Sequence, residues 1–160
     1  MNKIVIYYSM LGNTDYVAER IRKETGADLL RISPEKAYPD KGFRKFYWGG
    51  KSAIMAEKPK LLPYEIDLKQ YDLIIFGTPD WASNFVPPLR TFIEENRKAL
   101  EGKKIAAYVC CSGAGGNKVL NKLKDFIGIE AFETEAVFID PKERKNNEEE
   151  ISDFCKSIGL

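Results

Sequence analysis

The sequence predicts an α/β domain in which helices cover both faces of a parallel sheet. Runs of β-branched and aromatic residues without polar alternation, such as KIVIYY at Lys3 to Tyr8, indicate strands that are buried on both faces. Segments with apolar residues at helical spacing separate most of these runs. The chain has 160 residues, of which 44% are apolar, so we expect a single domain spanning residues 1–160 with its own core.

The chain opens with a strand, a short loop and a helix. The strand Lys3 to Tyr8 leads into a helix predicted over Asn13 to Thr25, which places Val17 and Ile21 on one apolar stripe. Gly26 follows at the position of a C-terminal cap. This is the opening unit of a βαβ arrangement.

The same alternation continues to the end of the chain. Further strands are expected at Ala27 to Ile32, Tyr71 to Gly77, Lys104 to Cys111 and Ala131 to Ile139. Helices are expected at Pro88 to Leu100, Lys118 to Ile127 and Glu148 to Ile158. The segment Ser33 to Gln70 is the least regular, and we expect one helix there, followed by an extended connector. Because right-handed crossovers link parallel strands, the loops that follow the strands should share one edge of the sheet.

The balance of charges, the lack of histidine and the cysteine pattern exclude several classes of function and site. With 25 basic and 24 acidic side chains the formal charge is +1, so no overall field attracts nucleic acid or an anionic membrane. The chain contains no histidine, so we expect no metal site and chemistry that depends on a bound reactive group. The three cysteines, Cys110, Cys111 and Cys155, form no CxxC pair, and no segment reads as a signal peptide or membrane span. We therefore expect a cytoplasmic protein.

A loop with anion-binding character follows the first strand. Hydroxyl side chains stand at both ends of this loop, around a single glycine: Ser9, Met10, Leu11, Gly12, Asn13 and Thr14. Amide groups at a helix start carry the positive end of the dipole, and small side chains let a phosphate approach them. The GK[ST] ending of a Walker A motif is absent, so a monophosphate fits better than ATP. Alternatively, Asn13 or Thr14 only caps the helix and Gly12 only makes the turn.

The second loop, Thr78 to Phe85, carries a tryptophan just beyond a predicted strand. At a loop tip, Trp81 would expose apolar surface unless something covered it. A flat aromatic ligand would cover it by offset stacking, whereas packing into the core is the alternative interpretation.

The third loop, Cys111 to Asn117, contains three glycines and an alanine, which leave its backbone bare. The edge of a heterocycle could receive amide hydrogen bonds there without interference from side chains. Glycine-rich turns also arise for conformational reasons alone.

Together the three loops resemble those of the flavodoxin family. YYSMLGNT is similar to its phosphate loop, GTPDWASNFVPP to its first flavin loop and CCSGAGG to its second, in the same order and at similar spacing. WGGK at Trp48 to Lys51 and EKPKL at Glu57 to Leu61 also resemble a bacterial short-chain branch of the family. The resemblance covers nearly the whole chain.

This resemblance implies a flavodoxin-like three-layer sandwich, with a five-stranded parallel sheet of order 2-1-3-4-5 and FMN bound at the switch point. The residues that would bind the phosphate are Ser9, Met10, Leu11, Gly12, Asn13 and Thr14. Those of the loop that would flank the isoalloxazine are Thr78, Pro79, Asp80, Trp81, Ala82, Ser83 and Asn84. Those that would meet its pyrimidine edge are Cys111, Ser112, Gly113 and Gly116.

Two departures from the family pattern affect these expectations. Leu11 stands where threonine is frequent, which implies one hydroxyl donor fewer for the phosphate. No glycine lies between Thr78 and Phe85, although flavodoxins commonly flip a peptide there toward the one-electron-reduced flavin. A flip here would force Asp80 or Asn84 into positive φ at an energetic cost, so we expect modest stabilisation of that flavin state.

The function implied is electron transfer through FMN between a reductase and an acceptor protein, with no catalytic side chain and with the chain a monomer or weak dimer. One alternative is an NADH- or NADPH-dependent, FMN-containing quinone reductase, for which the lysine-rich segment Ser33 to Gln70 could bind a dinucleotide phosphate. A second is a flavin-free interaction domain on the same fold. No long insertion offers a nicotinamide-binding surface, which favours the carrier.

Overall fold

The computed structural model describes residues 1–39, 51, 56–144 and 147–159. Its sheet consists of the parallel strands β1 (Lys3–Tyr7), β2 (Asp28–Arg31), β3 (Leu73–Pro79), β4 (Lys104–Cys111) and β5 (Glu135–Ile139). The described helices are α1 (Asn13–Thr25), α3 (Pro87–Leu100), α4 (Gly116–Ile127) and α5 (Asn147–Gly159), with a 3₁₀ turn η1 (Leu68–Gln70). The strand order is β2-β1-β3-β4-β5, which confirms the predicted topology.

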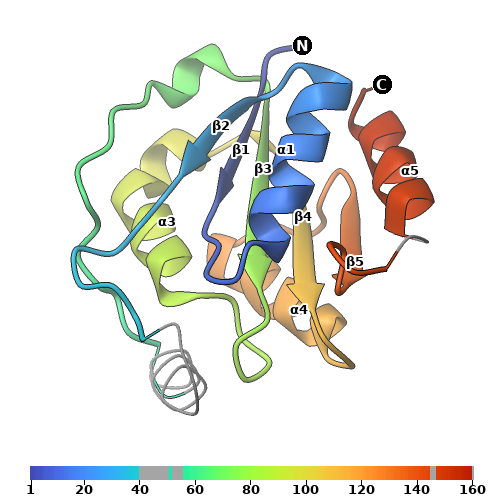
Figure 1. The fold of residues 1–160 in the computed structure, drawn as a ribbon. Coiled ribbons are helices and arrows are strands. Elements are labelled where there is room, and N and C mark those ends of the chain that lie inside the picture. The colour runs from blue at the N-terminus through green and yellow to red at the C-terminus, as the bar shows by residue number, and fades with distance from the viewer. Residues whose placement is uncertain (40–50, 52–55, 145–146, 160) are drawn as a thin grey trace.

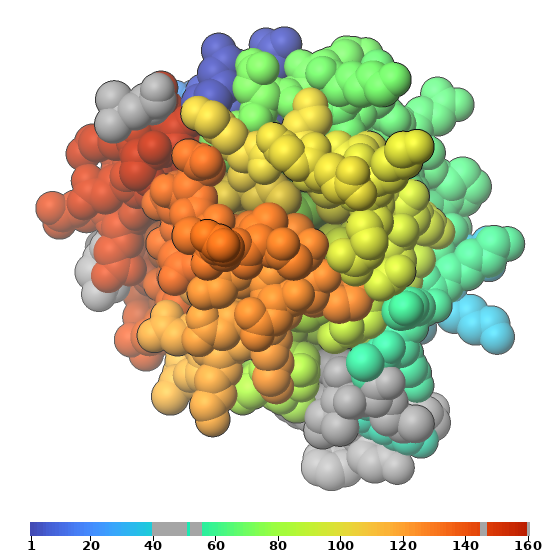
Figure 2. Space-filling model, turned by 180° about the vertical axis from the view of Figure 1, so that it is seen from behind, coloured from blue at the N-terminus to red at the C-terminus, as the bar shows by residue number. Residues whose placement is uncertain are grey.

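The molecule has three layers (Figure 1). Helices α1 and α5 lie on one face of the sheet, where Ile21 and Phe154 join a cluster of buried residues with Tyr108. Helices α3 and α4 lie on the opposite face, which Figure 2 shows covered by the yellow and orange parts of the chain. Phe92 and Leu123 belong to the apolar cluster on that side. Both faces are therefore packed, as the unbroken apolar strands predict.

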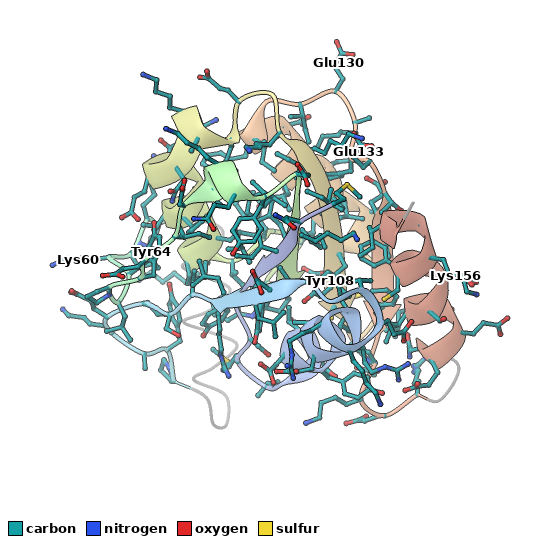
Figure 3. The ribbon with its side chains drawn as sticks, turned by 90° about the horizontal axis from the view of Figure 1, so that it is seen from above. Lys60, Tyr64, Tyr108, Glu130, Glu133 and Lys156 are labelled. Carbon is teal, nitrogen blue, oxygen red and sulfur yellow. The ribbon has the colours of Figure 1, made fainter. Side chains whose placement is uncertain are left out.

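The two central strands, β3 and β4, fit together through a glycine. A Cβ atom at Gly77 would lie 2.4 Å from the ring and hydroxyl of Tyr108, so only glycine leaves room for this fully buried ring. Figure 3 shows Tyr108 in the interior of the molecule. Its hydroxyl donates to the backbone carbonyl of Thr14, 2.9 Å away in the first turn of α1. The centre of the sheet is thus tied to the start of α1.

The carboxyl ends of the strands lie at one edge of the sheet, toward the bottom of Figure 1. Tyr7 of β1 is in register with Gly77 of β3, and Pro79 at the end of β3 is in register with Cys110 of β4. The three loops singled out in the sequence therefore leave the sheet side by side.

Most predicted boundaries agree with the structure within two residues, and β5 is the exception. It begins at Glu135, whereas the sequence predicted a strand from Ala131. The residues just before it bond to β4 from a bend, with Glu133 donating to the carbonyl of Ile105, so they are not part of the strand. The helix expected between Ser33 and Gln70, and the motif residues Trp48 to Gly50, lie outside the described residues.

Candidate functional site

The loop between β1 and α1 presents a helix N-terminus without a side-chain cap. Gly12 is the N-cap residue, with φ of 94°, and it provides no side-chain cap for the amides of the first turn. Asn13 and Thr14 are already helical, so the alternative that either of them caps the helix is wrong. Because the first amides of a helix have no partner within it, α1 offers N–H donors together with the positive end of its dipole.

Two buried hydroxyl groups flank these amides. Ser9 is 3% exposed and Thr14 is 1% exposed, as the sequence pattern of hydroxyl residues at both ends requires. The Oγ atom of Ser9 accepts a hydrogen bond of 3.1 Å from the amide of Gly12. The guanidinium of Arg31, at the end of β2, donates to the carbonyl of Ser9 at 2.8 Å. The loop is thus held in shape by a buried hydroxyl group and by the exposed Arg31 side chain.

The one acidic residue in the first turn of α1, Asp15, is engaged outside this loop. Its carboxylate accepts a hydrogen bond of 2.7 Å from the Tyr7 hydroxyl and lies 3.7 Å from the Arg31 guanidinium. Burial, together with the neighbouring Asp15, holds the pKa of Tyr7 well above its usual range, so the phenol stays a proton donor. The loop therefore keeps its positive character.

The loop after β3 folds into a two-residue hairpin. Trp81 and Asn84 exchange two backbone hydrogen bonds of 3.0 Å, and between them Ala82 and Ser83 have φ of 52° and 61°. Positive φ at both central residues is the pattern of a type I′ turn, in which Ala82 and Ser83 are those two residues. That a flip toward reduced flavin would force Asp80 or Asn84 into positive φ stays a prediction. Asp80 braces the turn, because its carboxylate accepts from the amide of Ser83 at 2.8 Å.

Trp81 stands at the base of this hairpin. Its ring is half-buried and makes edge-on contacts with Tyr8 and Tyr38, at centroid distances of 5.6 and 5.1 Å. It packs against the core cluster and also lines the cavity described below. Core packing of Trp81 is thus observed, and its stacking on a flat ligand stays a prediction.

Charged groups also meet at this hairpin. Burial raises the pKa of the Asp80 carboxyl. The Ser83 amide and Lys122 lower this pKa, but by less than burial raises it. The ammonium of Lys122, from α4, donates to the side-chain oxygen of Asn84 at 3.0 Å. A cation from outside the predicted loops thus reaches this end of the site.

The third loop connects β4 to α4. The thiol of Cys111 donates to the carbonyl of Gly113 at 3.1 Å, and burial raises its pKa, so it stays protonated at neutral pH. Gly115, with φ of 116°, precedes the first residue of α4. At the next position a Cβ atom on Gly116 would lie 2.4 Å from the Val137 side chain, so this glycine serves close packing.

One cavity of about 360 Å³ brings the three loops together. It is lined by Ser9, Met10, Leu11, Asn13, Thr14, Pro79, Asp80, Trp81, Ala82, Cys110, Cys111 and Ser112. The volume and the mixture of apolar and polar walls are typical of a small-molecule site. Six predicted site residues lie near the cavity without lining it: Gly12, Thr78, Ser83, Asn84, Gly113 and Gly116. Thr78 is fully buried, and its hydroxyl accepts from the amide of Val86 at 3.1 Å.

Sequence reasoning missed four residues at this site, one of which is Lys122. Cys110 lines the cavity, although only its neighbour Cys111 was selected. Arg31 is the last residue of the outer strand β2, and Lys142 lies just after the other outer strand, β5. Both contact the loop after β1. Arg31 and Lys142 could have been expected from the predicted topology, because the carboxyl ends of β2 and β5 lie at the same edge of the sheet as those of β1, β3 and β4.

Comparison with known proteins agrees with this geometry. A sequence profile described as flavodoxin matches residues 2–148. The chain belongs to the flavodoxin family. Among solved structures, a flavoprotein from Bacteroides eggerthii is 21% identical with a TM-score of 0.75, covering 99% of this chain and 98% of its own. A flavoprotein from Lactobacillus acidophilus, solved in complex with FMN, is 20% identical with a TM-score of 0.74, covering 89% and 95%. Oxidised flavodoxin 1 from Bacillus cereus is 22% identical with a TM-score of 0.53, covering 98% and 96%.

Within the part of the chain that the structure describes, none of the helices has both the length and the apolar character needed to cross a membrane.

Proposed function

We propose that residues 1–160 form a single FMN-binding domain that carries electrons between partner proteins in the cytoplasm. The observation that carries this proposal is the uncapped N-terminus of α1 at one end of a cavity whose other end is walled by Trp81. Such a cavity suits a ligand that is a phosphate monoester at one end and a flat aromatic ring at the other. Membership of the flavodoxin family supports FMN as that ligand.

The donors at the phosphate end fit a dianion. The first amides of α1 have no partner in the helix, and the buried Ser9 and Thr14 hydroxyls stand on either side of them. Hydrogen bonds to a charged acceptor are roughly twice as strong as neutral ones. Ser9, Thr14 and the amides of the first turn would therefore hold the phosphate without a metal ion.

The ring end of the cavity fits a flavin for different reasons. Trp81 supplies an aromatic wall, and its edge-on contacts with Tyr8 and Tyr38 fix the orientation of that wall. On the other side, Cys111 and Ser112 line the cavity at the start of the glycine-rich loop. When bound, FMN supplies the electron-accepting and electron-donating chemistry, and the protein supplies binding, orientation and a local field.

The field at the ring end comes from opposed charges. Asp80 lines the cavity, and the cost of burying its charge raises its pKa, so the carboxylate disfavours further negative charge beside it. Lys122 contacts the same hairpin through Asn84 and opposes this effect. We propose that these two groups, together with the half-buried Trp81, tune the affinity of the site for flavin in its different charge states.

The experiment that tests the proposal is titration of the purified protein with FMN and with riboflavin, followed by absorption and calorimetry. We expect one FMN per chain and much weaker binding of riboflavin, because the donors at α1 have no phosphate to bind in riboflavin. Equal affinities would contradict the phosphate assignment. A protein that stays colourless with excess FMN would indicate the flavin-free interaction domain.

A second measurement separates a carrier from a reductase. The carrier should accept electrons from a reductase protein and show little steady-state oxidation of NADH or NADPH with quinones. Fast turnover of either dinucleotide by the purified protein would instead support the quinone reductase.

A further inference from the structure

A lysine that is distant in sequence lies against the phosphate-side loop. Lys142 belongs to the turn between β5 and α5, and its Nζ atom lies 3.2 Å from the position that a Cβ atom would occupy at Gly12. The Cδ and Cε atoms of the same side chain lie 3.7 and 3.9 Å from that position. The end of the Lys142 side chain thus extends over the N-cap residue of α1.

Hydrogen bonds fix the backbone around Lys142, whereas its side chain is exposed and does not itself line the cavity. The amide of Lys142 donates to the side-chain oxygen of Asn13, the first residue of α1, at 3.3 Å. The turn itself is closed by a hydrogen bond of 2.9 Å from Glu143 to the carbonyl of Asp140. Asn147, which is 2% exposed, donates its side-chain amide to the carbonyl of Ile139 at 2.9 Å. These bonds hold the turn after β5 against the start of α1.

A bound anion would offset the unfavourable electrostatics of this placement. An ammonium group beside a helix N-terminus faces the positive end of the dipole, which is destabilising for a cation. Among the residues that the structure describes, no carboxylate forms an ion pair with Lys142. The nearest candidate in the helix, Asp15, is bound by Tyr7 and Arg31. A phosphate dianion at the first turn of α1 would interact favourably with both the dipole and the ammonium.

We propose that Lys142 is a phosphate-binding residue of the FMN site, supplied by the turn after β5 to the loop after β1. This inference rests on the proposed function. It assigns to the phosphate a positively charged side chain in addition to neutral donors and the helix dipole. Because riboflavin lacks the phosphate, Lys142 should contribute to the binding of FMN only. Its contribution should weaken as salt screens the charge.

The test compares Lys142→Met with Lys104→Met. Methionine keeps an unbranched side chain of similar length and removes the charge. Lys104 is an exposed lysine at the start of β4, at the opposite edge of the sheet, so its replacement changes the net charge equally without approaching the loop. The dissociation constants of FMN and riboflavin are measured for both variants and for the unmodified protein, at about 20 mM and about 500 mM salt.

We expect Lys142→Met to raise the dissociation constant of FMN about fivefold at low salt, as for a partly exposed ion pair. The difference should shrink at high salt, riboflavin affinity should not change, and Lys104→Met should behave like the unmodified protein. Equal FMN affinities of the two variants would overturn the role of Lys142 and leave the proposed function intact. Equal losses for FMN and riboflavin would also overturn it, because Lys142 would then act on loop structure alone. Failure of the unmodified protein to bind FMN would instead refute the proposed function.

Discussion

The loop Ser9–Thr14 and the hairpin Trp81–Asn84 line the same cavity but reach positive φ in different ways. In the first, Gly12 adopts it at no steric cost, and the flanking residues are held by buried hydroxyl groups. In the second, Ala82 and Ser83 adopt it, and each non-glycine residue there costs on the order of 1 kcal/mol or more. The comparison indicates a relaxed end, where we propose that the phosphate binds, and a strained end whose conformation depends on the contacts around it.

The largest effect should come from the relaxed end. Replacing Thr14 by valine keeps the shape of the side chain and removes its hydroxyl group, which is 1% exposed. We expect FMN binding to weaken by about 2 to 3 kcal/mol, since a charged oxygen loses a buried donor. Calorimetry with FMN and riboflavin measures this, with Thr14→Ser as the control that keeps the hydroxyl. Undiminished FMN affinity in Thr14→Val would mean that Thr14 only supports the helix start.

At the strained end, Trp81→Ala should weaken FMN binding by about 2 kcal/mol, because an aromatic wall and its buried area are lost. Trp81→Phe should retain most of the affinity. Because Trp81 also contacts Tyr8 and Tyr38, urea unfolding of both variants is needed to separate binding from stability. Normal FMN affinity in Trp81→Ala would restrict this residue to packing.

Placing glycine at position 82 and alanine at position 12 should change the free energy of unfolding in opposite directions. Ala82→Gly should raise the free energy of unfolding by about 0.5 to 1 kcal/mol, because relief of strain exceeds the entropy that glycine adds to the unfolded chain. Gly12→Ala should lower it by about 1 kcal/mol or more, since alanine at φ of 94° is strained. Both are measured by urea unfolding of the flavin-free protein. If both variants were destabilised, the hairpin would carry no strain that glycine relieves.

The smallest effect is the pH dependence of Asp80→Asn. Burial raises the folded-state pKa of Asp80 above its ordinary value of 3.8, so the folded state binds more protons than the unfolded state between these two values. The unmodified protein therefore loses stability as pH rises through that interval. Asparagine keeps the acceptor for the Ser83 amide and does not titrate. The stability of Asp80→Asn minus that of the unmodified protein should therefore be greater at pH 7 than at pH 3. Urea unfolding at both pH values measures the difference, and a pH-independent difference would exclude charge burial as its cause.

The sequence predicted the fold almost completely because the central strands β1, β3 and β4 are nearly unbroken apolar runs. The helix over Asn13 to Thr25 and the strand over Lys104 to Cys111 have the predicted bounds. Strand β5 was predicted too long because Glu133 and Thr134 lie in a bend that still bonds to β4, and Ala131 and Phe132 precede that bend. Such a bend is set by tertiary contacts and leaves no local pattern.

The loops of the site were visible in the sequence, but the contacts across them were not. Periodicity and glycine content indicate where a loop begins, whereas the approach of Lys142 to Gly12 depends on how far apart β1 and β5 lie in the sheet. The positive φ of Ala82 and Ser83 was not predicted, because a sequence without glycine does not reveal which two residues form the centre of the turn. Most cavity-lining residues of the three loops were therefore predicted, and residues that reach the loops from other elements were not.

The hydrogen bond from Tyr108 to the carbonyl of Thr14 joins residues that are 94 positions apart. During synthesis, the whole loop Ser9–Thr14 therefore emerges long before the residue that anchors it. At translation rates of about 5 to 20 residues per second, roughly 5 to 20 s separate the two events. Since Tyr108 also fills the space above Gly77, β4 must be in place before the start of α1 is fixed. A nascent chain should thus acquire a cavity able to retain a cofactor only late in translation, and loading should follow the pairing of β4 with β3.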